Sequence, residues 1–458
     1  MFIQQKRFWI WISVVVSGLL LVLSVGICGA KTTLTVWGGV WMNESTAGGP
    51  KATAEALKKA FPEYKLEIQP LSVGVTGPEQ QKLMIAVAGG NPPDIVHIDR
   101  YTVIQWATRG ALMPLDEYVE DPSVWDQYVQ TNLAEALYKG KTYAFPTSVD
   151  VRGIYWNKDH FKEVGLDPER PPKYWDELLT YAKKLTKYKG DTLERIGFSP
   201  FFGPVAYMFE WQNGGTFMGE DITGKVEGAK ILINSKENIE TLEFLTKLAD
   251  AQGGAAKLWS FQKGFQSGAQ SPFIIGILSM MNNGNWVLGN LARYAPYLNF
   301  GYAECPVPRK KGAKPWMVAG GWAFAIPRGV SHPEASYELG KWLTGVSGWK
   351  AQWQGEYELT QAKGKYFIPN ISVNISAQEL AEETYMSELP SKFQKAWKKA
   401  TELLEYGHIR PLVGIGGLIR DEHMRARQRA IYHEMSPKEA LEKARQTLQK
   451  ELDRIYQQ

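Results

Sequence analysis

The stretch AGGWAFAIPRG, residues 319–329, joins the pattern of a buried strand to an unusual beginning. Its residues 323–326 are apolar and a proline ends the run, which is typical of a strand in a protein core. Gly320 and Gly321 place the least bulky backbone directly ahead of Trp322, which carries the largest side chain. Glycine weakens a strand and often marks a bend or the close approach of another group. We therefore expect the chain to bend here, where it crosses between two sheets.

A second extended segment is interrupted in the same way. The sequence TYAFPTSVDVRGIYWNK, residues 142–158, has an apolar run on either side of a polar bend at 147–150. Along the chain, strand-like segments such as 33–37 alternate with helix-like segments such as 53–61. This alternation predicts βαβ units with parallel strands, and therefore an α/β fold.

The composition is that of a globular protein with ample material for a core. The chain has 458 residues, of which 44% are hydrophobic and 22% are charged. At roughly 100–200 residues per domain, this length predicts about two to four domains. The formal net charge is +4 and the basic residues are dispersed, without an arginine-rich stripe. We therefore expect no nucleic-acid partner.

Residues 1–30 differ in kind from the rest of the chain. They begin with the cations Lys6 and Arg7, continue as an apolar run and end in small residues, which is typical of a secretory signal peptide. We expect cleavage after Ala30, because a strand-like segment follows almost at once. An uncleaved anchor stays open, since the apolar run is longer than the usual ~7–15 residues, and so does lipid attachment at Cys28. This segment predicts export to the periplasm or the outer cell surface.

The cysteines and histidines do not indicate redox or metal chemistry. Export leaves Cys305 as the single cysteine of the mature chain, so we expect a buried thiol and no internal disulfide. The six histidines form no H-E-x-x-H motif, and VGIGG at 413–417 lacks the spacing of a phosphate-binding loop. We expect no metal, no cofactor and no catalytic residue. A pair of carboxylates for glycoside hydrolysis stays open, because a sequence does not show their separation.

Tryptophan gives the positive signal. The chain has 17 Trp, of which only Trp9 and Trp11 lie in the export signal. Many of the others stand beside Gly, Asn or a charged residue, as in VWGGVWMNE, EWQNGG, NNGNW and AGGW. An indole ring offers a broad electron-rich face that covers the C–H face of a sugar, while nearby carboxylates and guanidinium groups bind its hydroxyls. This combination favours a neutral polyhydroxylated ligand over the alternative that these rings are buried in cores.

A series of longer segments carries a resemblance to a known family. The segments are NPPDIVHID, the block YAFPTSVDVRGIYWNKDHFKEVGLDPERPPKYWDELLTYAKKL, GILSMMNNGNW, AGGWAFAIPRGVSHPEASYELGKWLTG, HIRPLVG and MSPKEALEKA. Their order resembles the extracellular solute-binding protein family 1 of ABC importers, which includes maltose- and trehalose-binding proteins. The resemblance covers nearly all of residues 31–458. One departure is Tyr174, where the family usually has a helix-capping threonine.

The resemblance implies a two-lobed periplasmic-binding-protein type II fold. Each lobe would be a mainly parallel sheet flanked by helices, and chain crossings near 145–152, 318–323 and 378–388 would join the lobes. After the signal peptide at 1–30, the implied division places 31–146 and 324–382 in lobe 1, and 147–319 and 383–458 in lobe 2.

A ligand between the lobes would meet residues from separate stretches of chain. Gly320 and Gly321 would let the crossing bend as the lobes close, and Trp322 would stack on the ligand. Asp99 and Arg100 follow an apolar strand at its carboxyl end, where open α/β sheets bind ligands. The remaining expected contacts, most of them implied by the family's motifs, are Trp37, Glu44, Asp150, Arg152, Trp211, Trp286 and Arg410, with Tyr207 as a further wall; Arg152 stays open as an ion-pair partner of Asp150.

The sequence thus predicts a non-catalytic exported receptor that captures a mono- or oligosaccharide. Its expected partners are the carbohydrate and the permease subunits of an ABC transporter. We expect a monomer that meets the membrane only through the permease or an N-terminal anchor. Two alternatives stay open, namely an exported glycosidase and a binding protein for a charged solute such as a polyamine or glycerol phosphate. The mixture of Asp, Arg and Trp fits a charged solute less well, because an anion site needs clustered arginines or helix-start amides.

Overall fold

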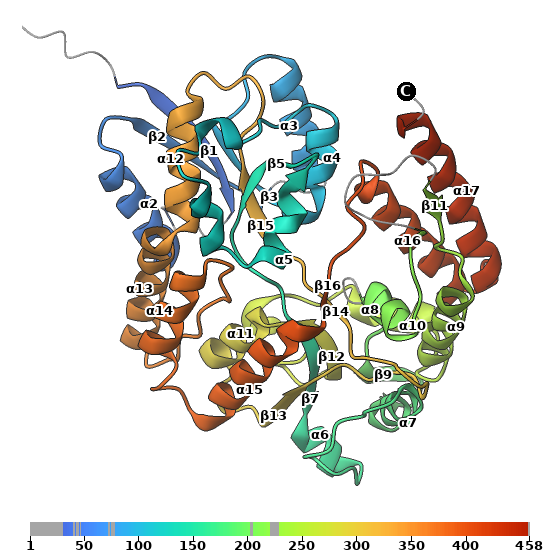
Figure 1. Cartoon of the computed structure of the whole chain (residues 1–458). Helices are drawn as coiled ribbons and strands as arrows, with labels where there is room; N and C mark the ends of the chain where they lie inside the picture. The colour runs from blue at the N-terminus through green and yellow to red at the C-terminus, as the bar shows by residue number, and fades with distance from the viewer. Residues whose placement is uncertain are drawn as a thin grey trace, which may run out of the picture.

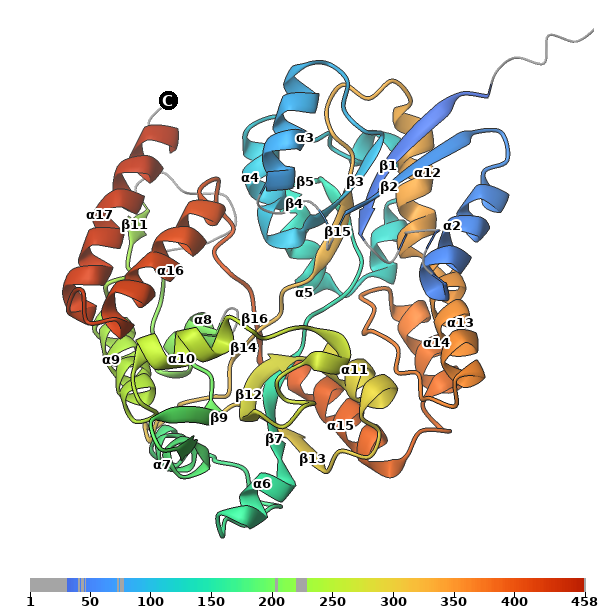
Figure 2. The ribbon, with the colours of Figure 1, turned by 180° about the vertical axis from the view of Figure 1, so that it is seen from behind.

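The chain forms two α/β lobes joined in the middle by extended segments (Figure 1 and, from behind, Figure 2). The computed structural model describes residues 31–39, 42, 45, 47–71, 74, 78–201, 205–219 and 229–456. The expected signal peptide, residues 1–30, lies outside the described residues. None of the helices in the described part of the chain combines the length and the apolar character needed to cross a membrane.

Lobe 1 is built on a five-stranded sheet. Its strands lie in the order β2 (Lys65–Leu71), β1 (Thr33–Gly39), β3 (Ile95–Asp99), β15 (Trp322–Ala325) and β6 (Ala144–Pro146). Successive side chains of a strand point to opposite faces. Leu34 and Phe324 accordingly belong to one core cluster, whereas Ile98 and Ala323 belong to another. Both faces of this sheet are therefore buried.

Helices cover the two faces of this sheet. The helix α12 (Pro333–Thr344) packs on one face through Leu339, and α4 (Val103–Thr108) packs on the other through Trp106. The other helices of lobe 1 are α2 (Gly49–Ala60), α3 (Pro78–Ala88), α5 (Gln130–Leu133), α13 (Val346–Ala362) and α14 (Ile375–Tyr385).

Lobe 2 is built on a second five-stranded sheet with one continuous core cluster. Its strands lie in the order β13 (Phe300–Ala303), β7 (Arg152–Asn157), β12 (Leu278–Gly284), β9 (Thr192–Phe198) and β8 (Lys187–Lys189). The helices of lobe 2 are α6 (Lys158–Glu163), α7 (Trp175–Leu185), α8 (Val205–Gln212), α9 (Lys236–Asp250), α10 (Ala255–Gln262), α11 (Trp286–Tyr294), α15 (Ser391–Glu402), α16 (Gly416–Ile431) and α17 (Pro437–Tyr456).

The prediction of a two-lobed α/β fold is confirmed, but the prediction of mainly parallel sheets is wrong in detail. In lobe 1, β1 pairs in parallel with β2 and β3, whereas β15 pairs antiparallel with β3 and β6. In the five-stranded sheet of lobe 2, β9 and β12 pair in parallel, whereas the other neighbouring strands pair antiparallel. The physical reason is that strands which enter a lobe from a crossing, such as β15 and β7, run against their neighbours.

Two extended segments cross between the lobes in contact with each other. Residues 147–151 link β6 to β7, and residues 319–321 link β14 (Met317–Val318) to β15. The crossings are joined by backbone hydrogen bonds, because the N–H of Thr147 donates to the carbonyl of Trp322 and the N–H of Asp150 donates to the carbonyl of Gly320, both at 2.9 Å. The bends expected at Gly320 and at 147–150 therefore lie in one hydrogen-bonded connection.

A third segment lies against these crossings. The N–H of Val149 donates to the carbonyl of Ile371 at 3.1 Å, and the N–H of Val373 donates to the carbonyl of Thr147 at 3.0 Å. This contact precedes the third crossing that was expected at 378–388, where α14 continues to Tyr385. The lobe boundaries implied by the sequence stay a prediction.

The guanidinium of Arg100 holds the two crossings to lobe 1. The side chain is fully buried, and its Nε donates to Glu135 Oε2 at 2.5 Å. Its Nη1 donates to the carbonyl of Ser148 at 2.8 Å, and its Nη2 donates to the carbonyls of Ala319 and Gly320 at 3.1 and 3.0 Å. One buried cation thus satisfies carbonyl groups from both crossings and has its counter-charge in Glu135.

We predict that Arg100→Met lowers the free energy of unfolding by about 3–5 kcal/mol, because it leaves the Glu135 carboxylate and the carbonyls of Ser148 and Ala319 without the donor that Arg100 supplies. Urea denaturation measures this change. A matched control is Arg454→Met, which removes an exposed ion pair with Glu451 and should cost less than about 1 kcal/mol. Equal effects of the two substitutions would contradict the role assigned to Arg100.

We predict that Gly321→Ala destabilises the protein by about 2–3 kcal/mol. Gly321 has a φ of +151°, and an added Cβ would lie 2.0 Å from the carbonyl oxygen of Ser148 and 2.8 Å from Nη1 of Arg100. Gly320→Ala is the control, since its Cβ would meet its nearest neighbours at 3.4 Å, an ordinary contact. Thermal unfolding should show a clear loss for the first variant only, and tolerance of both substitutions would refute this account of the crossing.

Candidate functional site

A cavity of about 630 Å³ lies between the two lobes at the crossings. Residues from lobe 1, from lobe 2 and from the crossings themselves contribute to its wall. The lining residues are Asp99, Asp150, Arg152, Phe201, Ala206, Tyr207, Trp286, Val318, Gly321, Trp322, Arg410, Arg420, His423, Met424 and Arg427. This volume falls within the range of small-molecule sites, which are roughly 300–1,000 Å³.

Strand pairing places the lobe 1 residues of the cavity. Asp99 ends β3 and Trp322 begins β15, and the two residues are directly opposite each other in the antiparallel pair. Side chains at opposite positions point to the same face of a sheet, so both reach the cavity. The ring of Trp322 stacks on His97 with a centroid distance of 4.9 Å and an interplanar angle of 18°. This contact covers one face of the indole, and Trp322 lines the cavity.

Two aspartate–arginine pairs supply the charges beside the crossings. Asp99 Oδ1 lies 3.2 Å from Arg410 Nη2, and Asp150 Oδ2 lies 3.2 Å from Arg152 Nη2. Burial lowers the pKa of the Arg152 guanidinium, and the charge of Asp150 opposes this shift. Because each aspartate uses one oxygen in its pair, the other oxygen stays available to accept a hydrogen bond from a hydroxyl.

Arg152 also supports the aromatic side chain that lobe 2 contributes to the cavity wall. Trp286 is the first residue of α11 and is 37% exposed. The guanidinium carbon of Arg152 lies 4.8 Å from the centre of the Trp286 ring, so the cation supports one side of the indole. Trp286 and Trp322 thus line the same cavity from different lobes.

Helices α8 and α16 form the remaining wall. His423 Nε2 lies 2.9 Å from Glu210 Oε1, and the imidazole meets the ring of Tyr207 edge to face at 4.5 Å. Burial raises the pKa of the Glu210 carboxyl, although His423 and Arg427 oppose this shift. The pair is a buried polar link between α8 and α16, which keeps this wall in place.

The structure brings most of the expected residues together. Seven of the twelve candidates line the cavity, together with Tyr207: Asp99, Asp150, Arg152, Trp286, Gly321, Trp322 and Arg410. Gly320 lies beside them, because a Cβ there would be 3.4 Å from both Arg410 Nη2 and Asp150 Oδ2. Glu44 lies outside the described residues.

Three expected residues have other surroundings in the structure. Arg100 is fully buried and binds Glu135 and the crossings, so it does not line the cavity. Trp211 is buried and stacks on His408 at 4.3 Å, and Trp37 packs against the core of lobe 1. Arg100 and Trp211 are already covered by protein, whereas Trp37 is only partly buried, and none of the three lines the cavity.

Sequence reasoning did not find the residues of α16. Arg420, His423, Met424 and Arg427 are three or four positions apart and therefore share one side of this helix. The spacing of three and four residues indicates a shared helix face, but charged residues on a helix more often form a face that is exposed to solvent. Only the fold shows that this face is turned to the cavity.

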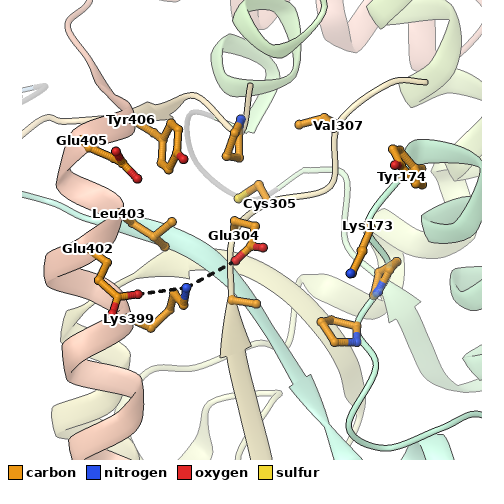
Figure 3. Close-up of a pocket in the computed structure, with 14 residues that line it drawn as sticks. Lys173, Tyr174, Glu304, Cys305, Val307, Lys399, Glu402, Leu403, Glu405 and Tyr406 are labelled. Carbon is orange, nitrogen blue, oxygen red and sulfur yellow. Dashed lines mark ion pairs between the residues drawn. The ribbon is translucent and has the colours of Figure 1, made fainter. Parts of the chain in front are cut away.

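Another hollow lies within lobe 2, and charged side chains in its wall pair with one another (Figure 3). Lys399 Nζ lies 3.8 Å from Glu304 and 3.0 Å from Glu402, so these charges are satisfied by one another. The ring of Tyr174 is covered by the Arg309 guanidinium at 3.8 Å, and the Tyr174 side chain caps no helix N–H.

The thiol in this hollow does not suggest reactivity. Cys305 is 2% exposed, which confirms the expected buried thiol, and burial raises its pKa. A thiol that stays protonated is a poor nucleophile. We therefore take the cavity between the lobes, and not this hollow, as the candidate functional site.

A cavity walled by two lobes that are joined through bendable crossings is the arrangement of a hinged binding protein. Residues 43–348 match the family described as bacterial extracellular solute-binding protein. The chain belongs to this family.

Curated relatives are similar at low identity. A putative binding protein of Brucella abortus is 26% identical over 269 residues, which cover 55% of this chain and 59% of that protein. The sn-glycerol-3-phosphate-binding periplasmic protein of Salmonella typhimurium is 25% identical over 79% of this chain and 84% of its own length. The arabinooligosaccharide-binding protein of Bacillus subtilis is 25% identical over 61% of this chain and 62% of its own length.

Solved structures show the same fold over nearly the whole chain. The mannobiose-bound structure of CpMnBP1 has a TM-score of 0.71 and 28% identity, and it covers 91% of this chain and 99% of its own. An ABC substrate-binding protein of Listeria monocytogenes in complex with cycloalternan has a TM-score of 0.73 at 20% identity, with 92% and 99% coverage. The two-lobed fold expected from the sequence is thereby confirmed.

Proposed function

We propose that this protein captures a mono- or oligosaccharide between its lobes and delivers it to the permease of an ABC importer. The protein acts as a monomeric receptor without catalytic activity, outside the cytoplasmic membrane. It reaches the membrane through the permease or through an N-terminal anchor. The family, whose members are extracellular solute-binding proteins, supports this proposal.

One observation carries the proposal. Trp286 from lobe 2 and Trp322 from lobe 1 line one cavity, although 35 residues separate them in the sequence. Each indole is supported on one side by another group, Arg152 or His97. Two such rings offer stacking faces to a sugar from both lobes, while Asp99 and Asp150 accept hydrogen bonds from its hydroxyls.

Closure follows from the same geometry. A ligand that touches both lobes makes its full set of contacts only when the lobes are together, so its binding increases the population of the closed state. The crossings at 147–151 and 319–321 are short, and they contain Gly320 and Gly321, which have no side chain to resist a change of backbone angle. The permease then recognises the closed form.

The arrangement favours this function over the two alternatives. In a glycosidase one carboxyl of the catalytic pair must be protonated to act as the acid, whereas Asp99 and Asp150 are both ion-paired with arginine. A site for glycerol phosphate needs arginines that are free to bind the anion, whereas Arg410, Arg152 and Arg420 are already paired with aspartates. The fourth arginine of the cavity, Arg427, has the Glu210 carboxylate as a neighbouring charge.

A thermal-shift screen tests the proposed function. Candidate ligands are mannobiose, mannotriose, maltose, arabinooligosaccharides, glycerol 3-phosphate and spermidine. A saccharide at 100 times its Kd should stabilise the protein by about 2.7 kcal/mol, because it binds only the folded state. Stabilisation by glycerol 3-phosphate or spermidine alone would replace the proposal with a charged solute, and release of reducing ends from the sugars would make the protein a glycosidase.

We predict that Trp322→Ala and Trp286→Ala each weaken binding of that saccharide at least about tenfold, because each removes one stacking face. Isothermal titration calorimetry measures the affinity, and circular dichroism confirms that the variants are folded. Trp349→Phe, which conserves an aromatic ring in a separate core cluster, serves as the control and should leave the affinity unchanged. An unchanged affinity in either alanine variant would remove that residue from the site.

A further inference from the structure

A second cavity of about 310 Å³ adjoins the first one. The two cavities share three lining residues, namely Phe201, Met424 and Arg427. The second cavity extends from this shared boundary between α10 and α16 of lobe 2. It has about half the volume of the first, so it adds substantial space to the cleft.

The additional space has an exposed aromatic wall. Trp259 of α10 is 47% exposed and Met424 of α16 is 51% exposed. The rings of Trp259 and Phe201 meet edge to face, with centroids 5.7 Å apart. A tryptophan that keeps half of its surface open beside a ligand cavity is typical of a binding surface.

Trp259 is not needed to hold α10 in place. This helix is anchored by Ala255 and Leu258, which are 5% and 0% exposed. Because the core contacts of α10 come from these residues, the exposed indole of Trp259 is free to serve a ligand.

Polar side chains of α16 surround this aromatic wall. The residues that line the second cavity from α16 include Asp421, Arg425 and Gln428, which are partly or fully exposed. They supply a carboxylate, a guanidinium and an amide, a set that both donates to and accepts from hydroxyl groups. The second cavity therefore repeats the combination of an aromatic face with mixed polar groups.

The two cavities form one continuous strip along α16. Arg420 lies at one end of this strip and Tyr432 at the other, with Met424 between them. Tyr432 is the C-cap of α16, and residues twelve positions apart along an α-helix are separated by about 18 Å. This length exceeds that of a single sugar ring, so one ligand that contacts the whole strip has several rings in a row.

We propose that the second cavity is an outer sugar subsite, so that the natural ligand is an oligosaccharide whose distal unit stacks on Trp259. This inference rests on the proposed function of the cleft. The inner units lie between Trp286 and Trp322, and the chain leaves the cleft past Phe201. Affinity then increases with the length of the oligosaccharide until the outer subsite is filled.

The test compares affinities along a series of oligosaccharides. Calorimetry is run with the disaccharide to the pentasaccharide of β-mannan, of the malto series and of arabinan, on the wild-type protein and on Trp259→Ala. In the wild type, the longer members of the preferred series should bind about tenfold more tightly than the disaccharide. Trp259→Ala should abolish this gain and leave the affinity for the disaccharide unchanged.

The matched control is Tyr297→Ala, which removes an aromatic side chain that is 78% exposed and lines neither cavity. It should bind every member of the series like the wild type. If Trp259→Ala keeps the gain with length, or weakens the disaccharide as strongly as the longer sugars, the outer subsite is refuted while the function of the cleft stands. If the wild-type protein binds none of the sugars, the proposed function fails, and the outer subsite fails with it.

Discussion

The buried guanidinium of Arg100 is the interaction on which the cleft depends. A cation without contact to water must find its acceptors within the protein, and Arg100 finds them in Glu135 and in three carbonyls of the two crossings. The residue next to it, Asp99, faces the cavity and binds Arg410. Two adjacent residues at the end of β3 therefore have different roles. Arg100 fixes the crossings, and Asp99 faces the ligand space.

The crossings also separate two cavities. In extended chain, neighbouring side chains point to opposite sides. Val149 lines a cavity of about 480 Å³ behind the crossings, whereas Asp150 lines the cleft. Ile409 likewise lines the cavity behind the crossings, whereas Arg410 lines the cleft. At these positions the polar side chain therefore faces the cleft, and the apolar side chain faces the cavity behind it.

Local patterns in the sequence were sufficient for the strands, the bends and the central aromatic residues. The glycines before Trp322 and the polar bend at 147–150 identified the crossings, because each breaks an apolar run at one point. Trp286 and Trp322 were found because their flanking glycines and asparagines are unusual for a core. These features depend on residues that are close together in the chain.

The rest of the site depends on contacts between distant residues. Nothing in the sequence near Arg100 shows that Glu135 lies beside it, so the guanidinium was expected in the cleft. The wall formed by α16 was missed for a similar reason, since the position of this helix is set by its packing on α17 and α9. The antiparallel course of β15 likewise follows from where the crossing enters lobe 1, which a strand pattern does not indicate.

A crystal structure of the protein with the saccharide selected by thermal shift is the most direct test of the central claim. The account predicts a sugar ring in contact with the indoles of both Trp286 and Trp322, with its hydroxyls bound by Asp99 or Asp150. A saccharide bound elsewhere on the surface, with the space between the two tryptophans filled only by water, would contradict it.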